Sequence, residues 1–340
     1  MNIEMLGLVI ILILVLLLPF TIKIVERNLE VFLFVMGILA ASISGMMEWP
    51  LIEKALLDPV KITVAVLVAG LLTKWLHEPL QKSILALNRA LSPRIFFALT
   101  VIILGLISSV ITAIIAAIIL VMIIHALPID RQSQIRFAIL ACYSIGMGAV
   151  LTPLGEPLST IAISKLDESF FYLLELIGWE VIPSVIIFGI LTMFFVKSNN
   201  ATDHVQSEQT TESYKEIIIR AVKIYLFVMG LTFLGHGFEP FINAYIIDLP
   251  PALLYWINMI SAVLDNATLA AAEVSPLMPE ETLRAVMLGL IISGGMLIPG
   301  NIPNIIAAGK LHITSKEWAR FGVPVGLVAM VAFFILLYAF

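Results

Sequence analysis

Two stretches, GEPLSTIAISKL at residues 155–166 and GNIPNIIAAGKL at residues 300–311, align without a gap. Both begin with glycine, place a proline within the next three positions and end with Lys-Leu. Proline removes a backbone donor, and glycine adds conformational freedom, so together they interrupt helices. We therefore expect a helix break in each stretch, at matching places in the two halves of the chain.

The chain around these stretches has the composition of a membrane protein. Of its 340 residues, 61% are hydrophobic and 13% are charged, whereas about 25% of residues are charged in a typical soluble domain. This composition excludes a soluble enzyme and a nucleic-acid-binding protein. The single cysteine, Cys142, excludes an intrachain disulfide. We predict an all-α polytopic protein whose partner is the lipid bilayer.

Hydropathy predicts about eight crossings and two hairpins that return to the side they came from. The single spans are expected at residues 4–21, 30–47, 60–76, 170–196, 216–236 and 318–340. The hairpins are expected at 95–127 and 251–276, and the broken helices at 134–166 and 283–311. Between them lie an amphipathic stretch at 77–93, a polar linker at 197–214 and an interfacial stretch at 237–249.

The aligned stretches divide the chain into repeats. Upstream of them, SSVITA at residues 108–113 aligns with SAVLDN at residues 261–266. Each half then has three crossings, and consecutive repeats with an odd number of crossings point in opposite directions. The predicted organisation lists two extra spans at 1–58, a first repeat at 59–196, the linker at 197–214 and a second repeat at 215–340. The alternative is chance similarity between apolar segments.

The positions of Lys and Arg favour hairpins over tilted spans, which are the alternative for the long runs. With hairpins, all but four of the 19 basic residues fall on one side of the membrane. The four are Lys54, Lys61, Lys165 and Arg284. Because basic residues collect on the cytoplasmic side, the linker is expected in the cytoplasm. We expect the protein in the cell membrane, that is, the inner or plasma membrane. Both termini are then expected on the outer side of that membrane.

Asp265 and Asn266 lie in the middle of the apolar run MISAVLDNATLAAAEV. An ionised carboxylate at the bilayer centre costs about 2.5–3.5 kcal/mol on insertion scales. At a hairpin tip, exposed backbone carbonyls can share a cation with the carboxylate. We therefore predict a Na⁺ site at Asp265 and Asn266. The alternative is a protonated Asp265 that serves as a buried hydrogen-bonding group.

The helix breaks carry further polar groups. Glu156 precedes a short half-helix, whose N-terminus favours a carboxylate, and the alternative role for Glu156 is to cap that helix. Asn301 takes the place of Glu156 in the second break, and Asn304 takes the place of Ser159. The remaining candidate ligands are hydroxyl groups, which could instead bond to backbone carbonyls. They are Ser108, Thr112, Ser261 and Thr268, and Thr112 aligns with Asp265.

The motifs SAVLDNATLAAA and GGMLIPGNIPNIIAAG resemble the ion transporter superfamily. That group includes NhaD-type and NhaB-type sodium/proton antiporters, arsenite permeases and sodium-coupled di- and tricarboxylate carriers. The resemblance covers the chain from residue 60 to its end, and is closest to a small prokaryotic group of membrane proteins labelled as cation transporters. It implies inverted repeats and a homodimer. The pair Asp265-Asn266 resembles the antiporter branches, whereas Thr112-Ala113 lacks the Asn common at the other tip.

These features predict a secondary transporter that exchanges Na⁺ for H⁺ by alternating access. No HExxH, GxSxG or GxxxxGK[ST] pattern occurs, so we expect no enzyme and no cofactor, with transport driven by an ion gradient. One alternative is a Na⁺- or H⁺-coupled symporter of a carboxylate or oxyanion. Another is a channel or a membrane sensor that does not transport.

Overall fold

The computed structural model describes residues 3–75, 91–197, 213–245, 249–263, 266–274 and 278–338. Every regular element in these ranges is a helix, as predicted, and no described residue lies in a strand. The first half contains α1 (Ile3–Thr21), α2 (Lys23–Arg27), α3 (Leu29–Ile43), α4 (Trp49–Trp75), α6 (Pro93–Ile111), α7 (Ala113–Ala126), α8 (Arg131–Ala149), α9 (Pro157–Leu166) and α10 (Tyr172–Phe195). The second contains α11 (Tyr214–Tyr245), α12 (Pro251–Ile257), η1 (Asn258–Ala262), α13 (Asn266–Glu273), α14 (Glu280–Gly294), η2 (Ile298–Gly300), α15 (Ile302–Leu311) and α16 (Ser315–Tyr338).

Four helices in the described ranges are long and apolar enough to cross a membrane, namely α6, α10, α11 and α16. Their outward faces are apolar as well. On α10 and α16 the exposed side chains include Ile187, Phe194, Val328 and Ile335. Apolar side chains exposed along whole helices mark a surface that contacts lipid. The chain is therefore a helical membrane protein.

Both predicted helix breaks are present. Residues 150–156 separate α8 from α9, and residues 295–301 separate α14 from α15. The two half-helices α9 and α15 are each ten residues long. Each ends at a residue in the left-handed conformation, Asp167 (φ 55°) or His312 (φ 52°). Left-handed residues stop helices because they turn the chain out of the helical path, so both half-helices end by the same device.

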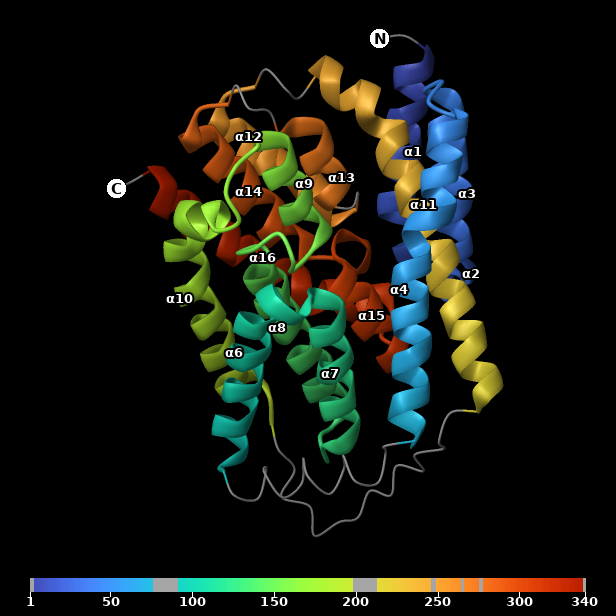
Figure 1. The fold of residues 1–340 in the computed structure, drawn as a ribbon. Coiled ribbons are helices and arrows are strands. Elements are labelled where there is room, and N and C mark those ends of the chain that lie inside the picture. The colour runs from blue at the N-terminus through green and yellow to red at the C-terminus, as the bar shows by residue number, and fades with distance from the viewer. Residues whose placement is uncertain are drawn as a thin grey trace.

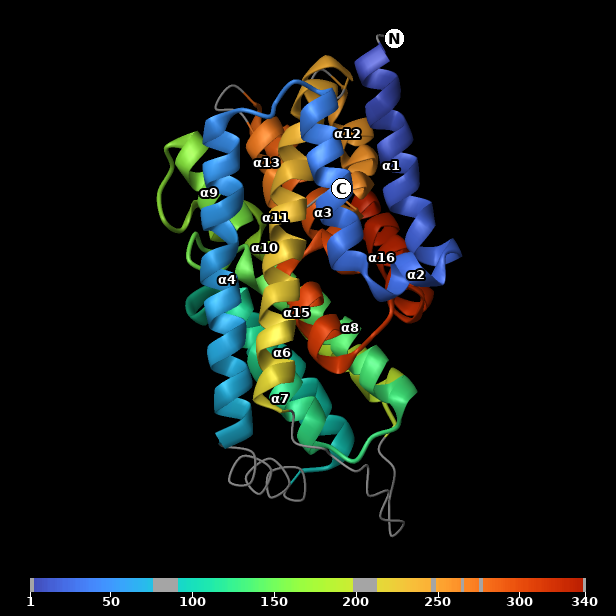
Figure 2. The ribbon, with the colours of Figure 1, turned by 90° about the vertical axis from the view of Figure 1, so that its right-hand side faces the viewer.

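The long apolar run at 95–127 divides at Thr112 into α6 and α7, and the run at 251–276 contains α12, η1 and α13. The second helix of each pair begins at Ala113 or Asn266, which are aligned positions in the sequence. Figures 1 and 2 show α6 and α7 toward one end of the molecule, and α12 and α13 toward the opposite end.

Helices of the two halves pack against one another in a reciprocal way. The half-helix α9 packs against α13, and the half-helix α15 packs against α7. Within the halves, α6 packs on α8 and α10, while α12 and η1 pack on α14. The long helices α4 and α11 lie side by side along one flank (Figure 2). In each broken helix, the longer piece (α8 or α14) packs mainly on helices of its own half. The half-helix (α9 or α15) packs on a helix of the other half.

Two helices extend beyond the segments predicted for them. The helix that contains the expected span 60–76 begins earlier, because α4 starts at Trp49 with proline in its first turn, a position that favours helix initiation. The expected boundary between residues 58 and 59 falls inside this helix. The stretch expected to be interfacial at 237–249 continues α11 as far as Tyr245, since apolar side chains such as Phe238 bury that part of the helix.

Several predicted features lie outside the described residues. Among them are Asp265 itself, most of the amphipathic stretch 77–93 and nearly all of the linker 197–214. The linker's last residue, Tyr214, is the first residue of α11.

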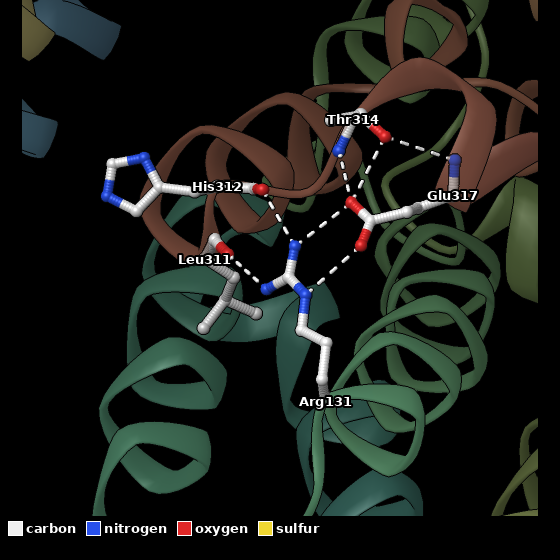
Figure 3. A network of polar contacts seen from close by, with 5 residues as sticks. All are labelled: Arg131, Leu311, His312, Thr314 and Glu317. Carbon is white, nitrogen blue, oxygen red and sulfur yellow. Dashed lines mark hydrogen bonds and ion pairs between the residues drawn. The ribbon is translucent and has the colours of Figure 1, made fainter. Parts of the chain in front are cut away.

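One arginine joins the start of α8 to the second half of the chain (Figure 3). Arg131 donates 2.7 Å hydrogen bonds to the backbone carbonyls of Leu311 and His312, at the end of α15. It also binds the Glu317 carboxylate through Nε at 3.2 Å and Nη2 at 3.0 Å. A cation at a helix C-terminus meets the negative end of its dipole. Arg131 therefore fixes the position of α15 relative to α8.

Candidate functional site

The two breaks are held by equivalent hydrogen bonds. Ser159 donates to the carbonyl of Thr152 at 2.7 Å, and Asn304 donates through Nδ2 to the carbonyl of Leu297 at 2.9 Å. These donors and acceptors are aligned positions in the two stretches. The Asn304 amide also reaches the carbonyl of Gly294 at 2.8 Å. Both predicted ligand residues thus satisfy backbone oxygens that the interrupted helices leave unpaired.

A second pair of equivalent bonds fixes the hairpin helices against the broken helices. The buried hydroxyl of Ser108 donates to the carbonyl of Ile145 at 2.9 Å, and that of Ser261 donates to the carbonyl of Leu290 at 3.2 Å. Here the alternative role considered from sequence, a hydroxyl bonded to a backbone carbonyl, is the one observed. Ser108 and Ser261 therefore position the helices that surround the breaks.

Glu156 and Asn301 occupy the same position in the two breaks, at the N-cap of α9 and of α15. Their backbones have nearly identical φ angles of −154° and −155°. Both side chains are buried, and neither accepts a hydrogen bond from the first turn of its own helix. The capping role considered for Glu156 is therefore absent from this structure.

Asn301 reaches across to the other half of the molecule. A Cβ atom placed on Gly146 of α8 would overlap the Asn301 amide nitrogen. Because Gly146 has no side chain, the Asn301 amide can lie directly against α8, the first helix of the first broken pair. Asn301 thereby links the second break to α8, the helix that leads into the first break.

Asn266 lies at the start of α13 and is buried. Its Nδ2 atom has no hydrogen-bond partner within the described ranges. At the end of α14, just before the second break, a Cβ added to Gly294 would lie 3.5 Å from that nitrogen. Amide oxygen and nitrogen are assigned by their hydrogen-bond partners, so a half-turn of this amide would present its oxygen to a cation. Thr268 lies two residues further along α13.

Thr112 has a backbone conformation that is rare for its type. Its φ of 76° is in the region that favours glycine, and β-branched residues adopt it only under constraint. The half-buried side chain accepts a 3.4 Å hydrogen bond from the backbone nitrogen of Ile115, in the first turn of α7. Next to it, Ala113 donates to the carbonyl of Gly155 at 2.8 Å. The first hairpin tip is therefore bonded directly to the first break.

The site thus combines buried amides, a carboxylate and backbone carbonyls around two helix breaks. No group of three His, Cys, Asp or Glu residues capable of holding a metal ion occurs among the described residues. Amide and carbonyl oxygens are hard ligands of the kind that bind alkali and alkaline-earth cations. Half-helix N-termini and amide N–H groups can instead bind anions.

Three buried polar residues near the second break were not chosen from sequence. Asn258, Glu273 and Ser293 are each at most 1% exposed. The Ser293 hydroxyl donates to the backbone carbonyl of Asn258 at 2.8 Å and lies 2.6 Å from the Ser261 hydroxyl. Asn258 could have been found from the sequence, because it is a polar residue inside an apolar segment. Glu273 lies near the end of the apolar run 251–276, where hydropathy alone indicates the membrane interface.

Comparison with known proteins gives a family and no more specific relative. No curated protein matches the chain. A family model described as "Protein of unknown function (DUF1646)" matches residues 5–340, which is nearly the whole sequence. The chain therefore belongs to the DUF1646 family.

Proposed function

We propose that the protein is a secondary active transporter that exchanges Na⁺ for H⁺ by alternating access. The observation that carries this proposal is the equivalence of the two broken helices. Aligned residues make the same bonds in both halves, as with Ser108 to Ile145 and Ser261 to Leu290. Paired interrupted helices from inverted repeats, with buried polar groups at the breaks, are typical of secondary transporters.

In this proposal the repeats have opposite orientations in the membrane, and each contains a re-entrant hairpin. The opposite ends occupied by α6–α7 and by α12–α13 in Figures 1 and 2 support that topology. So does the reciprocal packing of α9 on α13 and of α15 on α7. The linker 197–214 is cytoplasmic in the same proposal, and both termini are outside.

Asp265 is the proposed shared site, because one carboxylate can bind either a proton or a cation. Competition between the two is enough to couple their flows in opposite directions. The amides of Asn266 and Asn301, the Thr112 hydroxyl and backbone carbonyls at the breaks would complete the cation shell. Glu156 would be a second protonation or cation site. Movement of the hairpins and broken helices against the other helices would expose the site to alternate sides.

The test is Na⁺-driven proton movement in proteoliposomes that contain a pH-sensitive dye. The wild-type protein is expected to acidify or alkalinise the lumen according to the direction of the Na⁺ gradient. Asp265→Asn is expected to abolish this movement. The control is Glu175→Gln, since Glu175 is an exposed acid in the first turn of α10. Unchanged exchange in a folded Asp265→Asn protein would rule out the assigned role of Asp265.

A second candidate is symport of an anion with Na⁺ or H⁺. The unpartnered Asn266 Nδ2 favours it, because an N–H group in a buried site can donate to a carboxylate or oxyanion. The half-helix N-termini at Pro157 and Ile302 would supply further donors. Na⁺-dependent uptake of a labelled dicarboxylate, without proton exchange, would favour this candidate. Flux that cannot run against an opposing gradient would indicate a channel, and binding without flux a sensor.

A further inference from the structure

Glu273 is a buried carboxyl group outside the set of residues assigned above. It is the last residue of α13 and is 1% exposed. Neither of its carboxyl oxygens has a hydrogen-bond partner within the described ranges. An ionised carboxylate in such a place costs several kcal/mol unless a cation or donors compensate it. Its position at a helix C-terminus adds to that cost, since the dipole there is also negative.

The Asn258 side chain, at the start of η1, lies beside the Glu273 carboxyl, and η1 packs against α13. Asn258 is also 1% exposed, and its Oδ1 atom lacks a hydrogen-bond donor among the described residues. Its backbone is fixed by the bond from Ser293, and its Nδ2 atom makes only a long 3.5 Å bond to the carbonyl of Val286. Amide oxygen and nitrogen are assigned by their hydrogen-bond partners, so a half-turn of the Asn258 amide would place its Oδ1 atom beside the two unpartnered Glu273 oxygens.

We propose that Glu273 and Asn258 form a proton-binding site, in which the protonated Glu273 carboxyl donates a hydrogen bond to the Oδ1 atom of Asn258. A proton adds to one Glu273 oxygen and leaves from the same atom, and no other bond changes. This single proton removes the buried charge and supplies the donor that Asn258 lacks. Ca²⁺, a hard metal cation, takes about 6–8 oxygen ligands. Only three oxygens are available here, two from Glu273 and one from Asn258, and they suit a proton better.

Within the described ranges, no charged group on the helices packed against α13 forms an ion pair with Glu273. On α9, Lys165 donates to the carbonyl of Val274 at 3.4 Å, next to Glu273. On α14, Arg284 is paired with Glu180 and with Glu280. On α11, His236 is paired with Glu239, and the described residues of α12 and η1 carry no charged side chain. Lys165 keeps its positive charge near Glu273, but it does not bond to either Glu273 oxygen. A proton can neutralise the carboxyl group directly at those oxygens.

The site is distinct from the hairpin tip. Glu273 lies seven residues after Asn266 in α13, a rise of about 10 Å along a helix. Within the proposed antiport, on which this functional role rests, the pair would hold one of the exchanged protons. The binding of the proton can be measured without transport.

The experiment is an infrared pH titration of the full-length protein in lipid vesicles without Na⁺. It follows the C=O stretch of protonated carboxylic acids in H₂O and D₂O. A band that is present at low pH and disappears as the pH rises is expected in the wild type and lost in Glu273→Gln. The matched control is Glu281→Gln, because Glu281 is an exposed acid in the first turn of α14, and its variant should keep the band.

Asn258→Leu provides a second variant if Glu273→Gln does not fold. It removes the acceptor, so the same band is expected to shift toward the frequency of an acid without a hydrogen bond. The proposal is overturned if the titrating band is unchanged in Glu273→Gln or in Asn258→Leu, or absent from the wild type. It is also overturned if Na⁺ removes the band at constant pH, which would make this a metal-ion site. A titrating band without Na⁺-driven exchange would contradict the antiport and leave the proton site standing.

Discussion

The guanidinium of Arg284 on α14 lies 2.9 Å from Oε1 of Glu180 on α10, and this ion pair joins the two halves of the molecule. The Glu180 side chain is 5% exposed and that of Arg284 is 34% exposed. The second Glu180 oxygen, Oε2, has no hydrogen-bond partner among the described residues. Arg284 is therefore the group that makes the buried Glu180 carboxylate tolerable at this position.

Removing Arg284 alone should destabilise the protein strongly. Arg284→Met leaves a buried charge uncompensated, which costs about 2–4 kcal/mol at a partly exposed pair. The double variant Glu180→Leu/Arg284→Met should recover most of this loss, because no buried charge remains. The measurement is the thermal unfolding midpoint of the purified protein in detergent. Glu280→Gln is the control, since its 3.6 Å contact to Arg284 is mainly exposed. A double variant as unstable as Arg284→Met would contradict this account.

The planar guanidinium of Arg131 should not be replaceable by an ammonium group. Arg131 binds two carbonyls and a carboxylate at once, and Lys lacks the forked geometry for these contacts. We expect Arg131→Lys to lower the free energy of unfolding by about 1–3 kcal/mol. Arg136→Lys, five residues along α8, should have a smaller effect. Among the described residues Arg136 makes one 3.4 Å hydrogen bond, to the carbonyl of Phe195, and a Lys ammonium can replace its 5.7 Å contact with the Phe321 ring. Equal losses in both variants would show that the fork is unimportant.

The strained tip at Thr112 predicts an unusual tolerance of glycine. A non-glycine residue at positive φ costs about 1–3 kcal/mol, and glycine removes that cost. Thr112→Gly is expected to be at least as stable as the wild type in thermal unfolding. Thr112→Val keeps the strain and loses the bond to Ile115, so it should be less stable by about 1 kcal/mol. If the valine variant were the more stable of the two, the strain would be absent in solution.

We expect position 304 to tolerate serine, which is the residue at the equivalent position 159. Asn304→Ser would place there the side chain that makes the matching bond at Ser159. It should retain the bond to Leu297 and lose the one to Gly294. Asn304→Ala loses both, and a buried unpaired carbonyl costs about 1–3 kcal/mol. We expect Na⁺-driven proton movement to fall further in the alanine variant than in the serine variant. Equal activity in the two variants would show that the bond from residue 304 to the Leu297 carbonyl does not affect transport.

The equivalence between the halves explains why both helix breaks could be predicted from the sequence. Proline and glycine act on the local backbone, so the stretches at 155–166 and 300–311 were sufficient to predict where both broken helices are interrupted. The apolar runs likewise predicted helices, because a backbone in lipid must satisfy its own hydrogen bonds. The boundaries of α4 and α11 were missed, since one face of their extra turns packs on other helices, at Leu51 and Ala55 in α4 and at Phe238 in α11, and hydropathy does not specify that packing.

What the sequence alone determined was the class of the protein, its helix breaks and the polar residues placed at depth. Only the tertiary structure decided which atoms those residues meet. Ser108 bonds to a carbonyl 37 positions away, and Arg131 binds carbonyls about 180 positions away. Glu273, near the end of an apolar run, is fully enclosed by neighbouring helices. Burial and hydrogen-bond partners depend on contacts between segments far apart in the chain, and local composition carries no record of those contacts.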